Sequence, residues 1–219
     1  MSASILQNLK TRKMTLGSIL IAVIILMSFT PLGYLRIPAL AIEITFIVIP
    51  VAVGALLLGK YWGALLGGIF GITSFIQCFT GSVFGAALIA ENAVFTFILC
   101  MIPRILMGFL VGLFIEIYSK AAKSEGTKTV GYILGSVIAP LLNTVFFLLF
   151  LIVFFRNSDL SSIGLPFADM KLWDILVVLV SINSAIEIVS CGIIGFALSK
   201  VILRFVPAYR NTIKNPDTV

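Results

Sequence analysis

Long apolar runs separated by short polar connections form the pattern of hydrophobic and polar positions along the chain. A helix needs about 20 mostly apolar residues to cross a hydrocarbon core of roughly 30 Å, whereas a membrane-barrel strand needs only about ten. The runs here are far longer than a barrel strand, so the pattern predicts membrane-spanning helices. We predict six of them, at residues 14–30, 42–58, 61–78, 94–118, 129–155 and 172–203.

Composition points the same way. The chain has 219 residues, of which 60% are hydrophobic and 11% charged, and its mean hydropathy is +1.19. No water-soluble fold of ordinary size could bury so much apolar surface in one core. We therefore predict an all-α membrane protein in a lipid bilayer, built as a single integral membrane domain over residues 1–219 with a cytoplasmic tail at 206–219.

Eleven of the 15 basic residues gather on one side of the predicted spans. Cytoplasmic loops retain Lys and Arg, so this side is predicted to be cytoplasmic and to hold both termini. The net charge of +6 then follows from membrane topology, and no basic stripe interleaved with aromatics indicates nucleic-acid binding. The basic residues on this side are Lys10, Arg12, Lys13, Lys60, Lys120, Lys123, Lys128, Lys200, Arg204, Arg210 and Lys214.

The predicted outer connections are longer than the cytoplasmic ones. The stretch "LLGKYWG" turns the chain back within a few residues, whereas outer stretches such as "CFTGSVFGAALIAEN" (residues 78–92) are rich in Gly, Ser and aromatic residues. Loops of this kind on a rigid helical frame are where ligand contacts concentrate. The outer face is therefore predicted to carry the binding specificity.

Small residues recur at four-residue spacing within the predicted spans, which places them on one face of each helix. There the missing side chain lets a neighbouring backbone approach closely, so we predict internal packing of the third, fourth and fifth spans. Ser18 and Ala22 form a shorter version in the first span, where docking to another membrane protein is the alternative. The residues in the other three spans are Gly63, Gly67, Gly71, Gly108, Gly112, Gly131, Gly135 and Ala139.

Three polar side chains fall at nearly the same depth in the predicted bilayer. At 1.5 Å per residue, Arg104 lies roughly 15 Å along the fourth span, Asn143 roughly 18 Å from the outer end of the fifth, and Asn183 roughly 16 Å into the sixth. Pro103 and Pro140 precede the first two, and each proline frees a backbone carbonyl one turn earlier. A polar pocket between these three spans, open to the outside, is the predicted binding site.

Glu187 lies one turn after Asn183, so the two share a face of the sixth span. The structural alternative to a ligand site is an Arg104–Glu187 ion pair, with Asn143 and Asn183 as hydrogen bonds between helices. The two interpretations are compatible, because an arginine held by one carboxylate still has donors for a ligand.

The three cysteines, and Glu116 of the fourth predicted span, have structural interpretations. Cys78, Cys100 and Cys191 are odd in number and lie in or beside spans, which favours small apolar fillers over a disulfide framework or a metal site. Glu116 lies near the cytoplasmic end of its span, where it can reach the surface or pair with Lys120. The chain has no His and no pair of intramembrane aspartates, so we predict no catalytic residue, no metal site and no enzyme activity.

Two stretches carry a family resemblance that extends over most of the chain. They are "IPVAVGALLLGKYWGALLGGIFGITSF" (Ile49 to Phe75) and "PRILMGFLVGLF" (Pro103 to Phe114). With six predicted spans, the chain resembles the substrate-binding S component of an energy-coupling factor (ECF) vitamin transporter. "TSFIQCF" (residues 73–79), "CMIPRILMG" (residues 100–108) and "APLLNT" (residues 139–144) look most like the pantothenate type. S components for riboflavin, folate, thiamine or biotin, and a stand-alone secondary carrier or channel, are the alternatives.

The resemblance implies a non-catalytic subunit of an ABC-type importer in a bacterial plasma membrane. Such a subunit binds its vitamin from the outer face, using the loop between spans one and two and residues of the last three spans. It then associates with a transmembrane coupling protein, the T component, and with two ATPase subunits that use ATP, so no cofactor is expected in this chain. Ser18 and Ala22 of the first span would pack on the T component.

Pantothenate suits the predicted pocket chemically. Its carboxylate would bind Arg104, and its amide and two hydroxyl groups need partners that donate and accept, as Asn143 and Asn183 do. Glu187 would orient Arg104 or accept from a ligand hydroxyl. Phe75, Phe79 and Phe147 would supply aromatic walls for the gem-dimethyl group. Tyr34 and Arg36 would lie in the outer loop that closes over the ligand.

Overall fold

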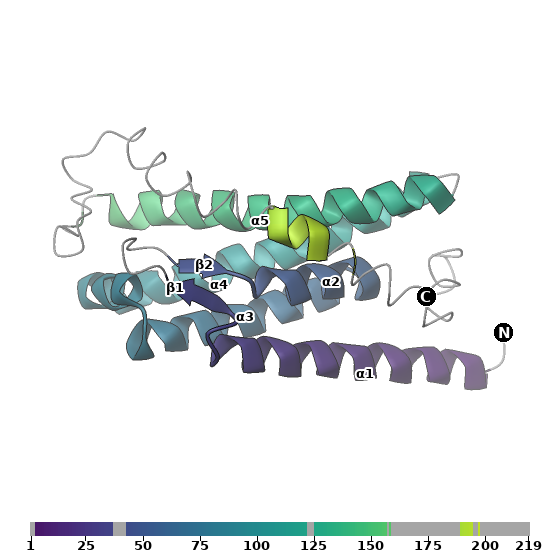
Figure 1. The fold of residues 1–219 in the computed structure, drawn as a ribbon, viewed down its shortest axis with the longest axis horizontal. Helices are drawn as coiled ribbons and strands as arrows, with labels where there is room; N and C mark the ends of the chain where they lie inside the picture. The colour runs from purple at the N-terminus through teal and green to yellow at the C-terminus, as the bar shows by residue number, and fades with distance from the viewer. Residues whose placement is uncertain are drawn as a thin grey trace.

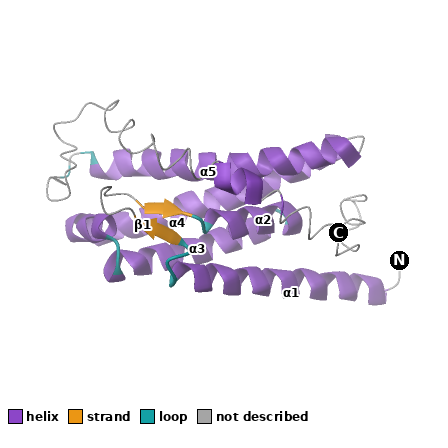
Figure 2. Cartoon of the chain, in the orientation of Figure 1, coloured by secondary structure: helices purple, strands orange, loops and turns teal. Residues whose placement is uncertain are grey.

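The computed structural model describes residues 3–36, 43–121, 125–156 and 158, together with 189–194 and 197. This part of the chain forms a bundle of long helices lying side by side, with a small antiparallel hairpin between the first two helices (Figures 1 and 2). The elements in chain order are α1 (Ala3–Ser28), β1 (Tyr34–Arg36), β2 (Glu43–Thr45), α2 (Val48–Leu58), α3 (Lys60–Thr80), α4 (Val83–Ala121) and α5 (Glu125–Phe155).

Within the described residues, four helical stretches are long and apolar enough to cross a membrane. The helical membrane architecture predicted from the apolar runs is therefore confirmed, with the addition of a two-stranded hairpin in the first connection. The predicted sixth span lies outside the described residues except for 189–194 and 197. The four stretches are Lys10–Ser28, Lys60–Thr80, Val83–Ala121 and Val130–Phe155.

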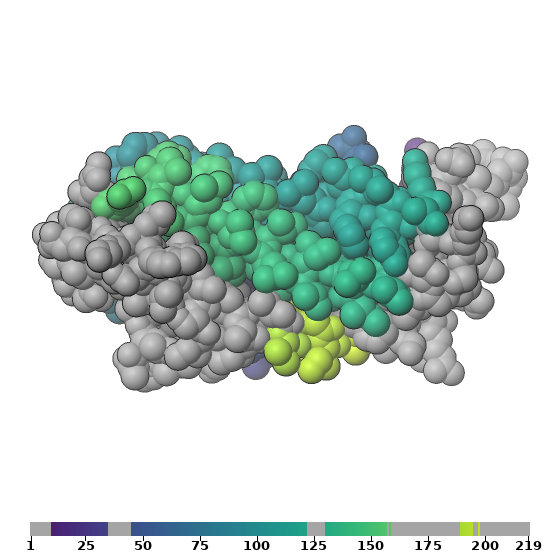
Figure 3. Space-filling model, turned by 90° about the horizontal axis from the view of Figure 1, so that it is seen from above, coloured from purple at the N-terminus to yellow at the C-terminus, as the bar shows by residue number. Residues whose placement is uncertain are grey.

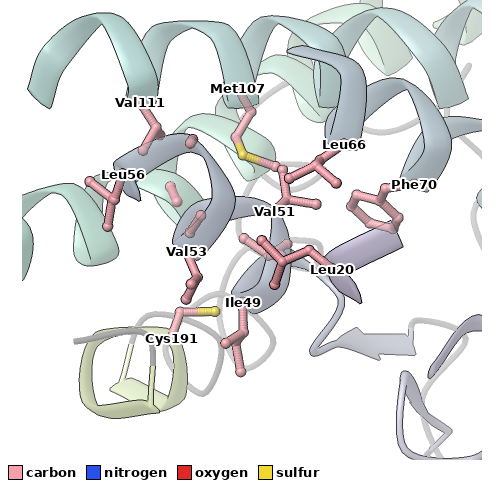
Figure 4. Packing of buried hydrophobic residues seen from close by; sticks show 14 of the residues in the cluster. Leu20, Ile49, Val51, Val53, Leu56, Leu66, Phe70, Met107, Val111 and Cys191 are labelled. Carbon is pink, nitrogen blue, oxygen red and sulfur yellow. The ribbon is translucent and has the colours of Figure 1, made fainter. Parts of the chain in front are cut away.

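The second predicted span, 42–58, needs correction. Its first residues form β2, and the helix that follows, α2, has only 11 residues, too few to cross the hydrocarbon core. Every residue of α2 is buried, and the helix packs against α1, α3, α4 and α5. A helix that is apolar all round belongs in a protein core as readily as in lipid. Figure 4 shows Val51, Val53 and Leu56 of α2 at the centre of this cluster.

The α3–α4 contact is a close approach of two backbones at glycine. A Cβ added to Gly63 would come within 2.2 Å of the Gly108 carbonyl oxygen, and one added to Gly67 within 2.1 Å of the Arg104 carbonyl oxygen. A Cβ added to either of the two glycines predicted on α5 would come within 2.4 Å of a side chain, Tyr118 of α4 for Gly131 and Leu56 of α2 for Gly135. The predicted internal packing of small residues is therefore confirmed, and it fixes where α4 presents its side chains to α3.

A tight turn joins α2 to α3 at Gly59, whose φ of 94° favours glycine. The next residue, Lys60, forms an ion pair with Glu116 of α4, with Nζ 3.0 Å from Oε2. Glu116 Oε1 also accepts a hydrogen bond of 3.2 Å from the Lys60 backbone N–H, at the N-terminus of α3. The predicted pairing of Glu116 with Lys120 is replaced by this contact, because tertiary packing brings a closer cation.

A break at Asn92, with φ −160° and ψ 105°, divides α4 into two helical parts. The Asn92 side chain accepts hydrogen bonds of 3.0 Å from the backbone N–H groups of Val94 and Phe95, so it caps the longer part. The predicted start of this span at 94 agrees with the cap. The predicted outer loop is corrected, since residues 83–91 are helical rather than irregular.

Helix α5 covers one face of the bundle, and residues 189–194 lie alongside it (Figure 3). A Cβ on Gly192 would be 3.3 Å from the Val137 side chain of α5. Its neighbour Cys191 is fully buried and belongs to the same apolar cluster as α2. The described part of the predicted sixth span therefore packs on α5 and on the core.

Candidate functional site

Arg104 lies buried in the middle of the bundle, on α4. Its side chain is 8% exposed, and its guanidinium carbon lies 5.0 Å from the centre of the Phe147 ring of α5 and 5.4 Å from that of Phe70 of α3. Aromatic faces attract a cation at such distances, and the attraction is stronger where water is excluded. Three helices thus hold one positive charge in an apolar interior.

The proline before Arg104 explains how the arginine is held. Pro103 has no backbone N–H, so the carbonyl of Leu99, four residues earlier, loses its helical partner. The Arg104 side chain turns back along the helix, and its Nη1 donates a hydrogen bond of 2.7 Å to this carbonyl. The Pro103-Arg104 pair therefore frees one backbone acceptor and satisfies it with the arginine, which fixes the guanidinium in position.

Three buried polar atoms on α4 and α5 have no hydrogen-bond partner among the residues that the structure describes. They are Nε of Arg104, Oδ1 of Asn143 and Oγ of Ser136. Asn143 and Ser136 lie seven residues apart on one face of α5, and Phe147 follows one turn after Asn143. A buried polar group without a partner is costly, so the arrangement is suited to a ligand or a further side chain that supplies one. An anion is the ligand that Arg104 would favour.

A second group of polar side chains lies at the C-terminal ends of α1 and α3. Ser28 Oγ is 2.9 Å from Thr73 Oγ1, and the Gln77 amide donates to the Ser28 carbonyl. These groups adjoin a cavity of about 510 Å³. The sequence interpretation missed the cluster, although Gln77 is a polar side chain inside an apolar run and is buried here. The cavity is lined by Ser28, Phe29, Thr30, Pro31, Tyr34, Gln77 and Thr80.

Phe75 and Phe79 do not share the face of α3 that carries Phe70. At about 100° per residue, the five residues from Phe70 to Phe75 turn the side chain by roughly 140°. The Phe75 ring instead packs edge-on against Phe79 at 5.2 Å and against Phe97 of α4 at 5.1 Å. Phe79 is 64% exposed. Of the three predicted aromatic walls, only Phe147 is brought to Arg104.

The structure places the site residues predicted in the outer loop, but not those predicted in the sixth span. Tyr34 is buried and lines the cavity beside Ser28 and Gln77. Arg36 ends β1, where its backbone stands opposite Glu43 of β2. Asn183 and Glu187 lie outside the described residues, and so does the predicted Arg104–Glu187 ion pair.

The small residues of α1 face outward. Ser18 and Ala22 are exposed and line a shallow groove of about 670 Å³ on the surface of α1. Gly17, by contrast, faces inward, since a Cβ there would meet the Trp62 ring at 2.2 Å. The helix therefore uses one small residue for internal packing and leaves two for the outer surface. The groove is lined by Thr11, Met14, Thr15, Ser18, Ile19 and Ala22.

Comparison with known proteins gives two matches. The family model described as ECF transporter, substrate-specific component, matches residues 12–209. The pantothenate transporter PanT of Leuconostoc mesenteroides subsp. mesenteroides is 30% identical over 203 residues, which is 90% of this chain and 95% of that protein. Both matches extend over nearly the whole chain, so the likeness includes the helices that carry Arg104, Asn143 and Gln77.

Proposed function

The chain belongs to the substrate-specific components of ECF transporters, and from this membership we propose that it binds pantothenate at the outer face of a bacterial plasma membrane. The protein is a multi-pass membrane protein. In this proposal it is the non-catalytic, vitamin-binding subunit of an importer. It holds no cofactor of its own, and partner ATPases use the ATP.

The observation that carries the proposal is the buried Arg104 guanidinium. It is held by the Leu99 carbonyl and two aromatic rings, while Nε has no partner within the described part of the chain. A carboxylate is the group that pairs best with a planar guanidinium. The Asn143 carboxamide, whose Oδ1 also lacks a partner there, could accept a hydrogen bond from an amide or a hydroxyl. Pantothenate has all three groups.

We propose a topology with both termini in the cytoplasm, in which the short buried helix α2, in place of a full second span, returns the chain from the hairpin to the turn at Gly59. In support, the described basic residues Lys10, Arg12, Lys13, Lys60 and Lys120 lie on elements that begin or end at one end of the bundle, while the hairpin lies toward the other (Figure 1). Cytoplasmic ends retain Lys and Arg. The Arg104 site would then open toward the hairpin side, where Tyr34 and Arg36 lie in β1.

The proposed partners are a transmembrane T component and two ATPase subunits, with α1 as the docking helix. Two small, exposed residues one turn apart, Ser18 and Ala22, support this role, because small side chains let a second helix approach closely in lipid. We expect Ala22→Phe to abolish co-purification with the T component and ATPases while leaving pantothenate binding by the isolated subunit unchanged. Val145→Phe, on the exposed side of α5, is the matched control. Equal loss of association in both variants would contradict docking through α1.

Isothermal titration of the detergent-purified full chain tests the proposed cargo. We expect saturable, tight binding of pantothenate and no comparable binding of riboflavin, folate, thiamine or biotin. Tight binding of one of the other vitamins would overturn the cargo and keep the family. In liposomes, we expect concentrative uptake only when the T component, the ATPases and ATP are present. Uptake by the chain alone would instead support a self-sufficient carrier.

A further inference from the structure

The outer cavity between α1 and α3 is chemically unlike the Arg104 site. None of its lining residues carries a charge, and its polar groups are two threonine hydroxyls, a serine, a tyrosine and the Gln77 carboxamide. Phe29 and Pro31 add apolar surface. Its volume of about 510 Å³ falls within the roughly 300–1,000 Å³ that is usual for small-molecule sites. The lining therefore suits a neutral group with hydroxyls and methyls rather than an anion.

One face of α3 connects this cavity with Arg104. Phe70, Thr73 and Gln77 follow one another at spacings of three and four residues, so they lie along the same side of the helix. The Phe70 ring touches the Arg104 guanidinium, the Thr73 hydroxyl donates to the Phe70 carbonyl at 2.9 Å, and Gln77 lines the cavity. Seven residues of helix separate Phe70 from Gln77 by about 10 Å.

We propose that this cavity is the second, uncharged half of the binding site, where Gln77 and Thr80 hydrogen-bond the hydroxyl groups of the cargo while Arg104 holds its carboxylate. The inference rests on the proposed function. An extended chain advances about 3.5 Å for every three bonds, so the roughly eight bonds between the carboxylate and the terminal hydroxyl of pantothenate span about 9 Å. One molecule is therefore long enough to reach both groups.

The chemistry of Gln77 fits such a role. A carboxamide offers two donors and one acceptor, which matches a hydroxyl that both donates and accepts. Thr80 Oγ1 lies 3.5 Å from Gln77 Oε1, so the two side chains present their polar groups together at the cavity. The Gln77 amide donates to the Ser28 carbonyl at the end of α1. A hydroxyl that binds here would therefore also contact the start of the loop that leads to Tyr34.

The test compares ligands that lack one end of the molecule. Isothermal titration is run with pantothenate, with pantothenol, which has an alcohol in place of the carboxylate, and with N-(3,3-dimethylbutanoyl)-β-alanine, which has no hydroxyl group. We expect Gln77→Met to lower the affinity for pantothenate and for pantothenol by about tenfold each. The affinity for the hydroxyl-free ligand should not change, because only the first two ligands lose a hydrogen bond. Thr80→Val, at an exposed position, should show the same pattern with a smaller loss.

The outcomes separate the inference from the function on which it rests. If the wild-type protein binds pantothenate and both Gln77→Met and Thr80→Val bind it with unchanged affinity, the proposed subsite is overturned and the proposed cargo stands. Equal weakening of all three ligands also overturns it, because that pattern indicates a structural role for Gln77. Absence of pantothenate binding by folded wild-type protein overturns the proposed cargo, and the subsite with it. Size-exclusion profiles and thermal melts establish folding, and Thr80→Val serves if Gln77→Met does not fold.

Discussion

Replacing Arg104 with methionine should reduce the affinity for pantothenate by roughly a hundredfold or more. The substitution keeps an unbranched apolar side chain between Phe70 and Phe147 but removes the charge that pairs with the carboxylate. Charge-assisted hydrogen bonds contribute about 1.5–3 kcal/mol each, and 1.4 kcal/mol is a factor of ten in affinity. Arg104 is the one charged side chain among the buried residues that the structure describes, so no other buried cation of that part of the chain can replace the lost donor.

Two controls show whether the loss belongs to the carboxylate. Pantothenol should bind the wild-type protein weakly, and its affinity should fall little further in Arg104→Met. The ligand carboxylate and the Arg104 guanidinium are the two sides of one contact, which is already lost when either is missing. Arg104→Lys keeps a positive charge but not the planar fork, so it should fall between the wild type and Arg104→Met. A folded Arg104→Met protein with unchanged pantothenate affinity would remove Arg104 from the site. Titration calorimetry measures all of these affinities, with thermal melts as the check on folding.

The sequence located Arg104 because a charge in an apolar run is costly and therefore informative. Phe147 was predicted as an aromatic wall of the pocket from the chemistry of the ligand, and the structure brings its ring within 5.0 Å of the guanidinium carbon. The same reasoning missed Phe70, whose ring lies against the other side of the guanidinium. An aromatic residue among many apolar ones gives no signal in one sequence. Only the close packing of α3 on α4 shows which of several phenylalanines faces the arginine.

The errors in the predicted fold have physical causes that can be named. Apolar composition alone cannot distinguish a helix in lipid from one enclosed by other helices, and this ambiguity extended α2 into a full span. Glycine-rich composition predicted an outer loop at residues 78–92, but the Asn92 cap begins the main part of α4 and leaves room for a short helix before it. Glu116 was paired with a neighbour in sequence because tertiary contacts such as that with Lys60 cannot be read from spacing.

Gln77 is the instructive omission at the candidate site. Charges and asparagines inside the predicted spans carried the prediction of the site, and Gln77, one residue before the end of the third predicted span, was assigned no role. In the structure it is buried and bonded to Ser28, 49 positions away in the chain. Long-range pairs of this kind depend on how α1 packs against α3, which the pattern of apolar residues does not determine.

Gly67→Ala should destabilise the protein and weaken pantothenate binding, whereas Gly68→Ala should do neither. A Cβ at Gly67 would lie 2.1 Å from the Arg104 carbonyl oxygen, far inside contact distance, and backbone atoms cannot rotate away as a side chain can. The helices must therefore separate where α4 carries Arg104. At Gly68 the nearest atom to an added Cβ is a side-chain carbon of Ile105 at 3.7 Å, which is ordinary contact.

The two variants add the same methyl group to the same helix at adjacent positions, so their difference isolates the α3–α4 contact. Alanine favours a helix over glycine by about 1 kcal/mol, which should leave Gly68→Ala as stable as the wild type or slightly more so. Overpacking typically costs about 1–3 kcal/mol, so Gly67→Ala should melt several degrees lower. Its affinity for pantothenate should fall further than its affinity for pantothenol, because moving Arg104 affects the carboxylate contact first. Thermal melts and titrations of both variants measure this, and identical behaviour of the two would mean that the backbone approach at Gly67 does not position Arg104.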